Sequence, residues 1–149
     1  KIMKRLFLIG AVFLSIGAHA TDPTIDDLVK TPDEIIFQPI PEFEGLEAAI
    51  IAGNPSEEGP YVLRVKFRAG VLSKPHFHDQ ARHVTVLKGA WHFGLGQGGE
   101  CTGTKPVKAG GAAIHPNGIV HYDGACAGET IVEITGVGPV KTVFAIQGE

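Results

Sequence analysis

Glycine and proline interrupt the chain so often beyond residue 45 that no long helix fits there. The sequence holds 20 glycines and 10 prolines, and both residue types break helices. Turn sequences at 55–60, 96–99 and 136–139 separate short apolar runs. The run 61–67 alternates apolar with charged residues, which is typical of a strand with one buried face. The pattern therefore predicts an all-β sandwich or barrel.

The segments between these turns predict the positions of the strands. Besides 61–67, strands are expected at 46–51, 83–87, 90–95, 111–115, 130–135 and 141–146. Residues 21–45 contain four prolines and are interpreted as an N-terminal arm. A short helix is expected within it at 25–29, with Thr24 as its cap. Residues 46–149 would then form one β-barrel.

The first 20 residues have the layout of a secretory signal peptide. Lys1, Lys4 and Arg5 precede an apolar run, and small residues follow at 18–20. The run of about 13 apolar residues is short for a membrane span, which needs about 20. We therefore expect cleavage after Ala20 and a secreted or periplasmic protein with no membrane segment after cleavage.

Secretion determines how the two cysteines are interpreted. Cys101 and Cys126 are the only cysteines, and an oxidising compartment favours a disulfide between them. The alternative, a thiolate metal ligand, fits poorly because both lie in Gly-rich loops away from the histidines.

Three of the seven histidines lie within ten residues of one another. Side chains two apart on a strand share a face, so His76 and His78 would project together. Two adjacent imidazoles are costly to bury unless they share a cation, hydrogen bonds or solvent. The pair therefore indicates a metal site, with an exposed loop pair as the alternative.

Two stretches around these histidines resemble the two motifs of the cupin family. The first consists of Gly70, His76-Phe77-His78 and Gly89, and the second of Gly110, Pro116-Asn117-Gly118 and His121. The resemblance extends from about residue 46 to residue 144. It implies a cupin-type jelly-roll β-barrel with a metal inside, held by His76, His78 and His121. It also implies a homodimer, which in small cupins commonly forms through the N-terminal arms.

The chain departs from the family at the fourth ligand. Where the first motif of cupins has a glutamate, this sequence has Arg82, and a guanidinium cannot bind a cation. Arg82 either points inward, as a candidate catalytic residue that holds an anionic substrate, or outward to a carboxylate such as Asp79. His83 is a further candidate metal ligand. Strand alternation turns it away from the site, whereas a β-bulge would turn it inward.

Other polar residues near the motifs are weaker candidates for the functional site. Tyr122 follows a ligand histidine and is a second candidate catalytic residue that would donate a hydrogen bond near the metal. His115 would either line the cavity or pack in its strand. Because neighbouring residues of a strand face opposite sides, either Trp91 and Phe93 or His92 lies inside the barrel.

Three neutral imidazoles without a carboxylate favour copper, with zinc or nickel as alternatives. We expect a copper-dependent oxidoreductase that uses O2 or peroxide on an extracellular organic molecule or carbohydrate, such as plant-cell-wall polysaccharide. The alternatives are a zinc- or nickel-dependent hydrolase or isomerase, and a non-catalytic cupin that binds metal or a small ligand. Acidic residues outnumber basic ones by 16 to 13 and no basic stripe occurs, so nucleic acid is not expected as a partner.

Overall fold

The computed structural model describes residues 22–145, so the predicted signal peptide lies outside the described residues. The chain divides after Lys30 into two compact units, each of which is described by itself. No helix within residues 22–145 is long and apolar enough to cross a membrane.

The first unit contains the helix α1, Ile25–Leu28, close to its predicted position. Thr24 is the N-cap, as predicted, and its backbone N–H and hydroxyl donate to the Asp27 carboxylate at 2.9 and 2.7 Å. These hydrogen bonds tie the chain before the helix to its first turn. They also hold the pKa of Asp27 below its ordinary value.

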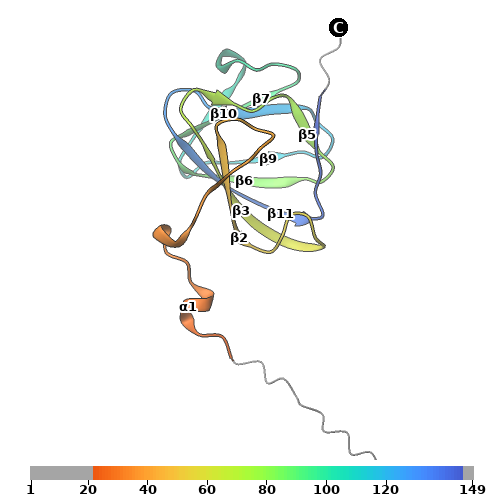
Figure 1. The fold of residues 1–149 in the computed structure, drawn as a ribbon. Coiled ribbons are helices and arrows are strands. Elements are labelled where there is room, and N and C mark those ends of the chain that lie inside the picture. Colours follow the sequence, from red (N-terminus) through yellow and green to blue (C-terminus); the bar gives the residue numbers. More distant parts are fainter. Residues whose placement is uncertain (1–21, 146–149) are drawn as a thin grey trace, which may run out of the picture. The chain divides into compact units, whose positions relative to one another are not determined.

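The second unit is a barrel of two antiparallel sheets, which Figure 1 shows as two layers. One sheet has the order β1-β2-β3-β11-β6-β9, and the other has the order β12-β5-β10-β7-β8, with β4 also paired to β10. The strands are β1 Gln38–Pro39, β2 Leu46–Ala52, β3 Gly59–Phe67, β4 Val71–Leu72, β5 His76–His78, β6 Arg82–Lys88, β7 Ala90–Leu95, β8 Lys105–Lys108, β9 Ala112–His115, β10 His121–Ala125, β11 Thr130–Gly138 and β12 Thr142–Phe144; two single 3-10 turns are η1 Pro32–Glu34 and η2 Cys101–Gly103. The prediction of an all-β jelly roll is confirmed.

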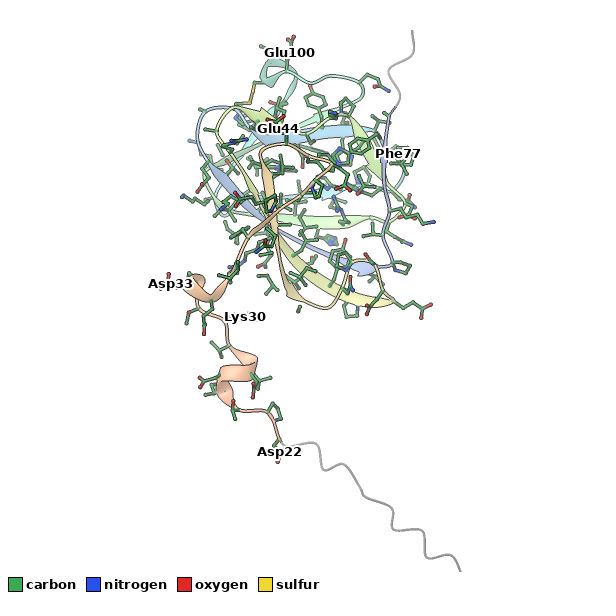
Figure 2. The ribbon with its side chains drawn as sticks, in the orientation of Figure 1. Asp22, Lys30, Asp33, Glu44, Phe77 and Glu100 are labelled. Carbon is green, nitrogen blue, oxygen red and sulfur yellow. A yellow bond between two sulfur atoms is a disulfide. The ribbon has the colours of Figure 1, made fainter. Side chains whose placement is uncertain are left out.

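Side chains from the inner faces of both sheets fill the barrel (Figure 2). Strand β6 shows this alternation, since Val84 and Val86 are buried whereas His83 and Thr85, which alternate with them, are exposed. Each fully buried valine stabilises the fold by about 1.5–3 kcal/mol relative to an exposed one. The buried core comprises Leu46, Tyr61, Val65, Phe67, Val84, Val86, Trp91, Ala125, Val132 and Ile134.

All of the expected strands are present, with ends that differ by a few residues. Strands β1, β4, β8 and β10 were not predicted, and β5 was assumed only in the argument for His76 and His78. Strand β8 contains two lysines and a proline, and it forms because it pairs with the edge of β7. Strand β1 lies in the segment interpreted as an arm and pairs with β2, and Ile40 and Phe43 nearby pack against the core.

Four glycines of the two cupin-like motifs adopt a left-handed backbone. Their φ angles are 78° at Gly70, 77° at Gly89, 87° at Gly110 and 70° at Gly118. At Gly89 a side chain would also collide with the backbone oxygen of Glu129. Only glycine meets both demands without strain, so this turn fixes where β6 ends and β7 begins.

The predicted disulfide between Cys101 and Cys126 is present. Figure 2 draws it in yellow beside the loop that carries Glu100. It joins the loop after β7 to the end of β10 and closes a loop of 25 residues. The bond therefore fixes the loop that covers the outer face of the second sheet.

Removing this bond should lower the free energy of unfolding. Replacing both cysteines with serine is expected to cost about 3 kcal/mol, because the unfolded chain regains the entropy of the open loop. Urea titrations of the oxidised wild type, the reduced wild type and the double variant measure the difference. Equal stability of all three would contradict the expectation.

A three-histidine cluster inside the barrel

Strands β5 and β10 bring the three predicted histidines together. His76 and His78 share the inner face of β5, and His121 lies directly opposite His76 in the antiparallel pair. The exposed fraction is 4% for His76, 1% for His78 and 0% for His121. One ring nitrogen of each lies within 4.8 Å of the others. The cluster is therefore buried, and the alternative of an exposed loop pair does not apply.

Backbone carbonyls set the orientation of two of these rings. His76 Nδ1 lies 2.7 Å from the Lys74 carbonyl oxygen, and His121 Nδ1 lies 2.9 Å from that of Ile119. A carbonyl only accepts, so Nδ1 carries the proton and the Nε2 lone pair is free. Within the described residues, the buried His121 Nε2 has no hydrogen-bond partner. Such fixed rings with free Nε2 atoms are typical of metal-binding histidines.

Arg82 points into the barrel. Its Nη2 lies 2.5 Å from His78 Nε2 and 2.9 Å from His115 Nδ1, and the residue is 9% exposed. Asp79, the alternative partner, instead accepts a hydrogen bond from the backbone N–H of Lys141 at 2.7 Å. Of the two predicted orientations of Arg82, the structure has the inward one.

Two further buried residues complete the site, namely His115, which takes the predicted alternative of lining the cavity, and Asp123, which was not predicted. His115 lies opposite Arg82 in the β6–β9 pair, and its Nε2 lies 3.3 Å from the Asp123 carboxylate. Arginine only donates, so His115 accepts at Nδ1 and presents its Nε2 proton to Asp123. Asp123 also accepts from the Ser73 hydroxyl at 2.7 Å. A buried chain of contacts thus connects the Arg82 cation to the Asp123 anion.

The interior keeps the histidines neutral. Burial lowers the pKa of His76 and of His115, and it lowers the pKa of His121 to about 4. Burial and the adjacent Arg82 guanidinium lower the pKa of His78 to about 2. A neutral imidazole is the form that binds a metal, so the cluster is ready for one without losing protons.

Asp123 is ionised in this environment. Burial alone would raise its pKa, but contacts with His115 and Ser73 outweigh burial and hold the pKa well below its ordinary value. Burial lowers the pKa of Arg82, although a guanidinium remains charged at neutral pH. The two opposite charges therefore offset each other across His115.

Acid should destabilise the metal-free protein. The buried histidines have folded-state pKa values below the 6.5 of an ordinary histidine. Below about pH 6.5 the unfolded chain therefore binds more protons than the folded chain, and the free energy of unfolding falls by up to about 1.4 kcal/mol per pH unit for each such ring. Urea titrations of chelator-treated protein between about pH 7 and pH 5 measure this slope. A stability that does not change over this range would contradict the expectation.

His83 lies outside the cluster. It is exposed on the outer face of β6, as alternation from Arg82 requires. The register shift between β6 and β11 falls at Ile131/Val132, opposite the far end of β6, so no bulge turns His83 inward. The candidate fourth ligand is thus not brought to the metal site.

Tyr122 also faces away from the histidines. It is 3% exposed and lies on the opposite face of β10 from His121. Its ring and hydroxyl pack where side chains of Gly94, Gly98 and Gly103 would lie. The expected hydrogen bond from Tyr122 to the metal site is therefore not part of this geometry, and the contacts of Tyr122 are those of a packing residue.

Aromatic rings enclose the cluster. Phe43 contacts the edge of His76, with ring centroids 5.3 Å apart, and Phe144 contacts Phe43 at 5.1 Å. On the inner side, Trp91 and Phe93 stack on each other, and Phe93 contacts His121. Trp91 and Phe93 are thus the inward set of their strand. The apolar shell limits access of water to the site.

The donor set fits a transition metal. It offers three neutral nitrogens, two of them oriented by backbone carbonyls, and the Asp123 carboxylate is engaged elsewhere. Nitrogen ligands of this kind suit copper, zinc or nickel better than calcium or magnesium.

Comparison with known proteins agrees with this architecture. No protein-family model and no curated protein matches the chain. Among solved structures, it is similar to the polyketide cyclase RemF from Streptomyces resistomycificus, with 16% identity, a TM-score of 0.68, and coverage of 81% of this chain and 87% of that one. An RmlC-like cupin from Shewanella frigidimarina NCIMB 400 has 18% identity, a TM-score of 0.57, and coverage of 72% and 87%.

A third similar structure is a sugar phosphate isomerase of the cupin superfamily from Silicibacter pomeroyi. It has 18% identity and a TM-score of 0.58, and the match covers 77% of this chain and 80% of that one. At sequence identities this low, similarity between structures indicates a shared fold and not a shared activity. The chain therefore has the jelly-roll fold of the cupin superfamily.

Proposed function

We propose that this chain is a copper-dependent cupin oxidoreductase that acts with O2 or peroxide on a small organic or carbohydrate substrate outside the cell. The observation that carries the proposal is a donor set of three buried, neutral histidines that, among the described residues, includes no carboxylate. Copper heads the affinity order of divalent first-row metals for such nitrogen sites. A bound copper ion would supply one-electron chemistry with oxygen.

The residues around the cluster would have distinct tasks. His76 and His121 hold their Nε2 atoms in place through the Lys74 and Ile119 carbonyls. Phe43 and the inner aromatic rings keep the surroundings dry, which strengthens every electrostatic interaction there. Arg82 contributes a fixed positive charge beside His78.

Metal analysis tests the proposal directly. Protein purified without a histidine tag is loaded with copper and examined by electron paramagnetic resonance. We expect about one copper per chain and a Cu(II) signal with nitrogen hyperfine structure. Oxygen uptake in the presence of a reductant then separates an oxidoreductase from a protein that only binds metal. Failure to bind copper would refute the proposal.

A second candidate is Lewis-acid chemistry on zinc or nickel, such as isomerisation or cyclisation. Two similar structures favour it, since one is named a polyketide cyclase and another a sugar phosphate isomerase. This candidate predicts turnover without oxygen and with redox-inactive zinc. Assays with and without oxygen on the zinc- and copper-loaded protein therefore distinguish the two.

We also propose secretion or a periplasmic location, and a homodimer. The disulfide between Cys101 and Cys126 supports an oxidising compartment. Expression of the full sequence fused to a reporter that is active only outside the cytoplasm tests export. Light scattering of the mature chain tests the dimer.

A further inference from the structure

Arg82 brings a permanent positive charge into direct contact with the histidine cluster. Its Nη2 lies 2.5 Å from His78 Nε2. Because a guanidinium only donates, the hydrogen bond engages the His78 Nε2 lone pair, which a metal would also use. The other nitrogen, Nδ1, then carries the proton and faces the Thr142 hydroxyl oxygen at 3.1 Å. His78 therefore binds a metal only if Arg82 gives up this contact.

The other two histidines are not restrained in this way. His76 Nδ1 and His121 Nδ1 donate to carbonyl oxygens, which leaves both Nε2 lone pairs free. Their ring centroids are 4.5 Å apart. The site thus offers two available ligands, His76 and His121. For the third, His78, a metal must compete with Arg82.

Beside His78 the nearest fixed charge is positive, whereas the charge of the Asp123 carboxylate acts on His76 and His121. Asp123 offsets Arg82, but His115 separates the two. The repulsion between Arg82 and a metal ion scales with the charge of the ion, and it is strong in a buried site. For an ion that would use His78, the repulsion by Arg82 is therefore about twice as large for a divalent ion as for a monovalent one.

We infer that Arg82 makes this centre selective for monovalent copper over divalent ions, with His76 and His121 as its principal ligands. Monovalent copper accepts two neutral nitrogen ligands, whereas zinc is almost always four-coordinate in structural sites. The inference rests on the proposed function in one respect, namely that the cluster binds a metal.

Competition titrations test it on the tag-free, disulfide-bonded chain. Affinity for Cu(I) is measured against bicinchoninate under anaerobic, reducing conditions that leave the disulfide intact. Affinity for Zn(II) is measured against a chromophoric chelator. The variant is Arg82→Gln, which keeps a hydrogen-bond donor and removes the charge. The control is Arg64→Gln, which removes a charge from the partly exposed pair with Glu133 on the outer face of the barrel.

Arg82→Gln should tighten Zn(II) binding by at least about tenfold and change Cu(I) binding by less than about threefold. Arg64→Gln should change neither. An unchanged ratio of the two affinities in Arg82→Gln, or weaker Zn(II) binding, would overturn the inference while leaving the metal centre in place. Absence of binding of either metal to the wild type and to Arg82→Gln would overturn the proposed function as well.

Circular dichroism checks that the variants fold. If Arg82→Gln leaves Asp123 uncompensated and does not fold, the double variant Arg82→Gln/Asp123→Asn removes both buried charges. The same rise in Zn(II) affinity is expected of this double variant, because the Arg82 guanidinium that contacts His78 is absent. An affinity ratio equal to that of the wild type would count against the inference.

Discussion

Replacing Asp123 with asparagine should lower the free energy of unfolding by about 3 kcal/mol or more, because it leaves a buried cation without its counter-charge. Asp123 is 4% exposed and lies 3.3 Å from His115, which in turn contacts Arg82. Asparagine keeps the size of the side chain, so the loss reports mainly the charge. Urea titration at neutral pH, with the metal removed, measures the effect.

A surface pair provides the matched control. Glu133 contacts Arg64 at 3.0 Å, and both side chains are about a quarter exposed. Glu133→Gln should cost about 1 kcal/mol or less. The double variant Asp123→Asn/Arg82→Gln should be more stable than the sum of its single variants predicts, since neither charge remains unpaired. If Asp123→Asn behaved like Glu133→Gln, the proposed charge balance across the barrel would be wrong.

Replacing His121 with alanine should weaken metal binding more than about 100-fold. Loss of residues that merely orient a ligand costs 10–100-fold, and His121 would be a ligand itself. Its Nε2 is buried without a partner in the described part of the chain. Titration with Cu(I) and Zn(II), together with paramagnetic resonance of the copper-loaded protein, measures the loss.

His83→Ala is the matched control for this variant. It removes an imidazole of the same kind from the exposed face of β6. We expect its metal affinity to equal that of the wild type. Equal losses in both variants would mean that the metal binds elsewhere, and retention of full affinity in His121→Ala would exclude the cluster as the site.

Local patterns predicted an all-β barrel and the shared face of His76 and His78, whereas the jelly roll and the convergence with His121 were implied by the resemblance to the two cupin motifs. Alternation determines which side chains share a face, and glycine turns such as Gly89 determine where strands end. The disulfide followed from the count of cysteines and the predicted compartment. None of these predictions required knowledge of which strands pair.

The charge network could not be predicted in the same way. Its members come from β6, β9 and β10 and from the segment before β5, so their contacts depend on tertiary pairing. One signal was available, since Asp123 follows His121 by two residues and would share its face on a strand. Residues 121–125 were not among the predicted strands.

Arg82 and His83 show what decides between alternatives that a local pattern leaves open. Alternation predicted that one faces inward and the other outward, and only the position of a bulge could reverse this. The register shift falls near Val132, beyond the reach of His83. Pairing with β11, and not the residues of β6 themselves, therefore settles the orientation.

The packing of Tyr122 against three glycines has a consequence for related sequences. Any side chain at Gly94, Gly98 or Gly103 would overlap its ring or hydroxyl. Substitutions at these four positions should therefore covary in an alignment of relatives. Chains that keep the tyrosine should keep all three glycines, and larger residues should appear there only where a smaller residue replaces the tyrosine.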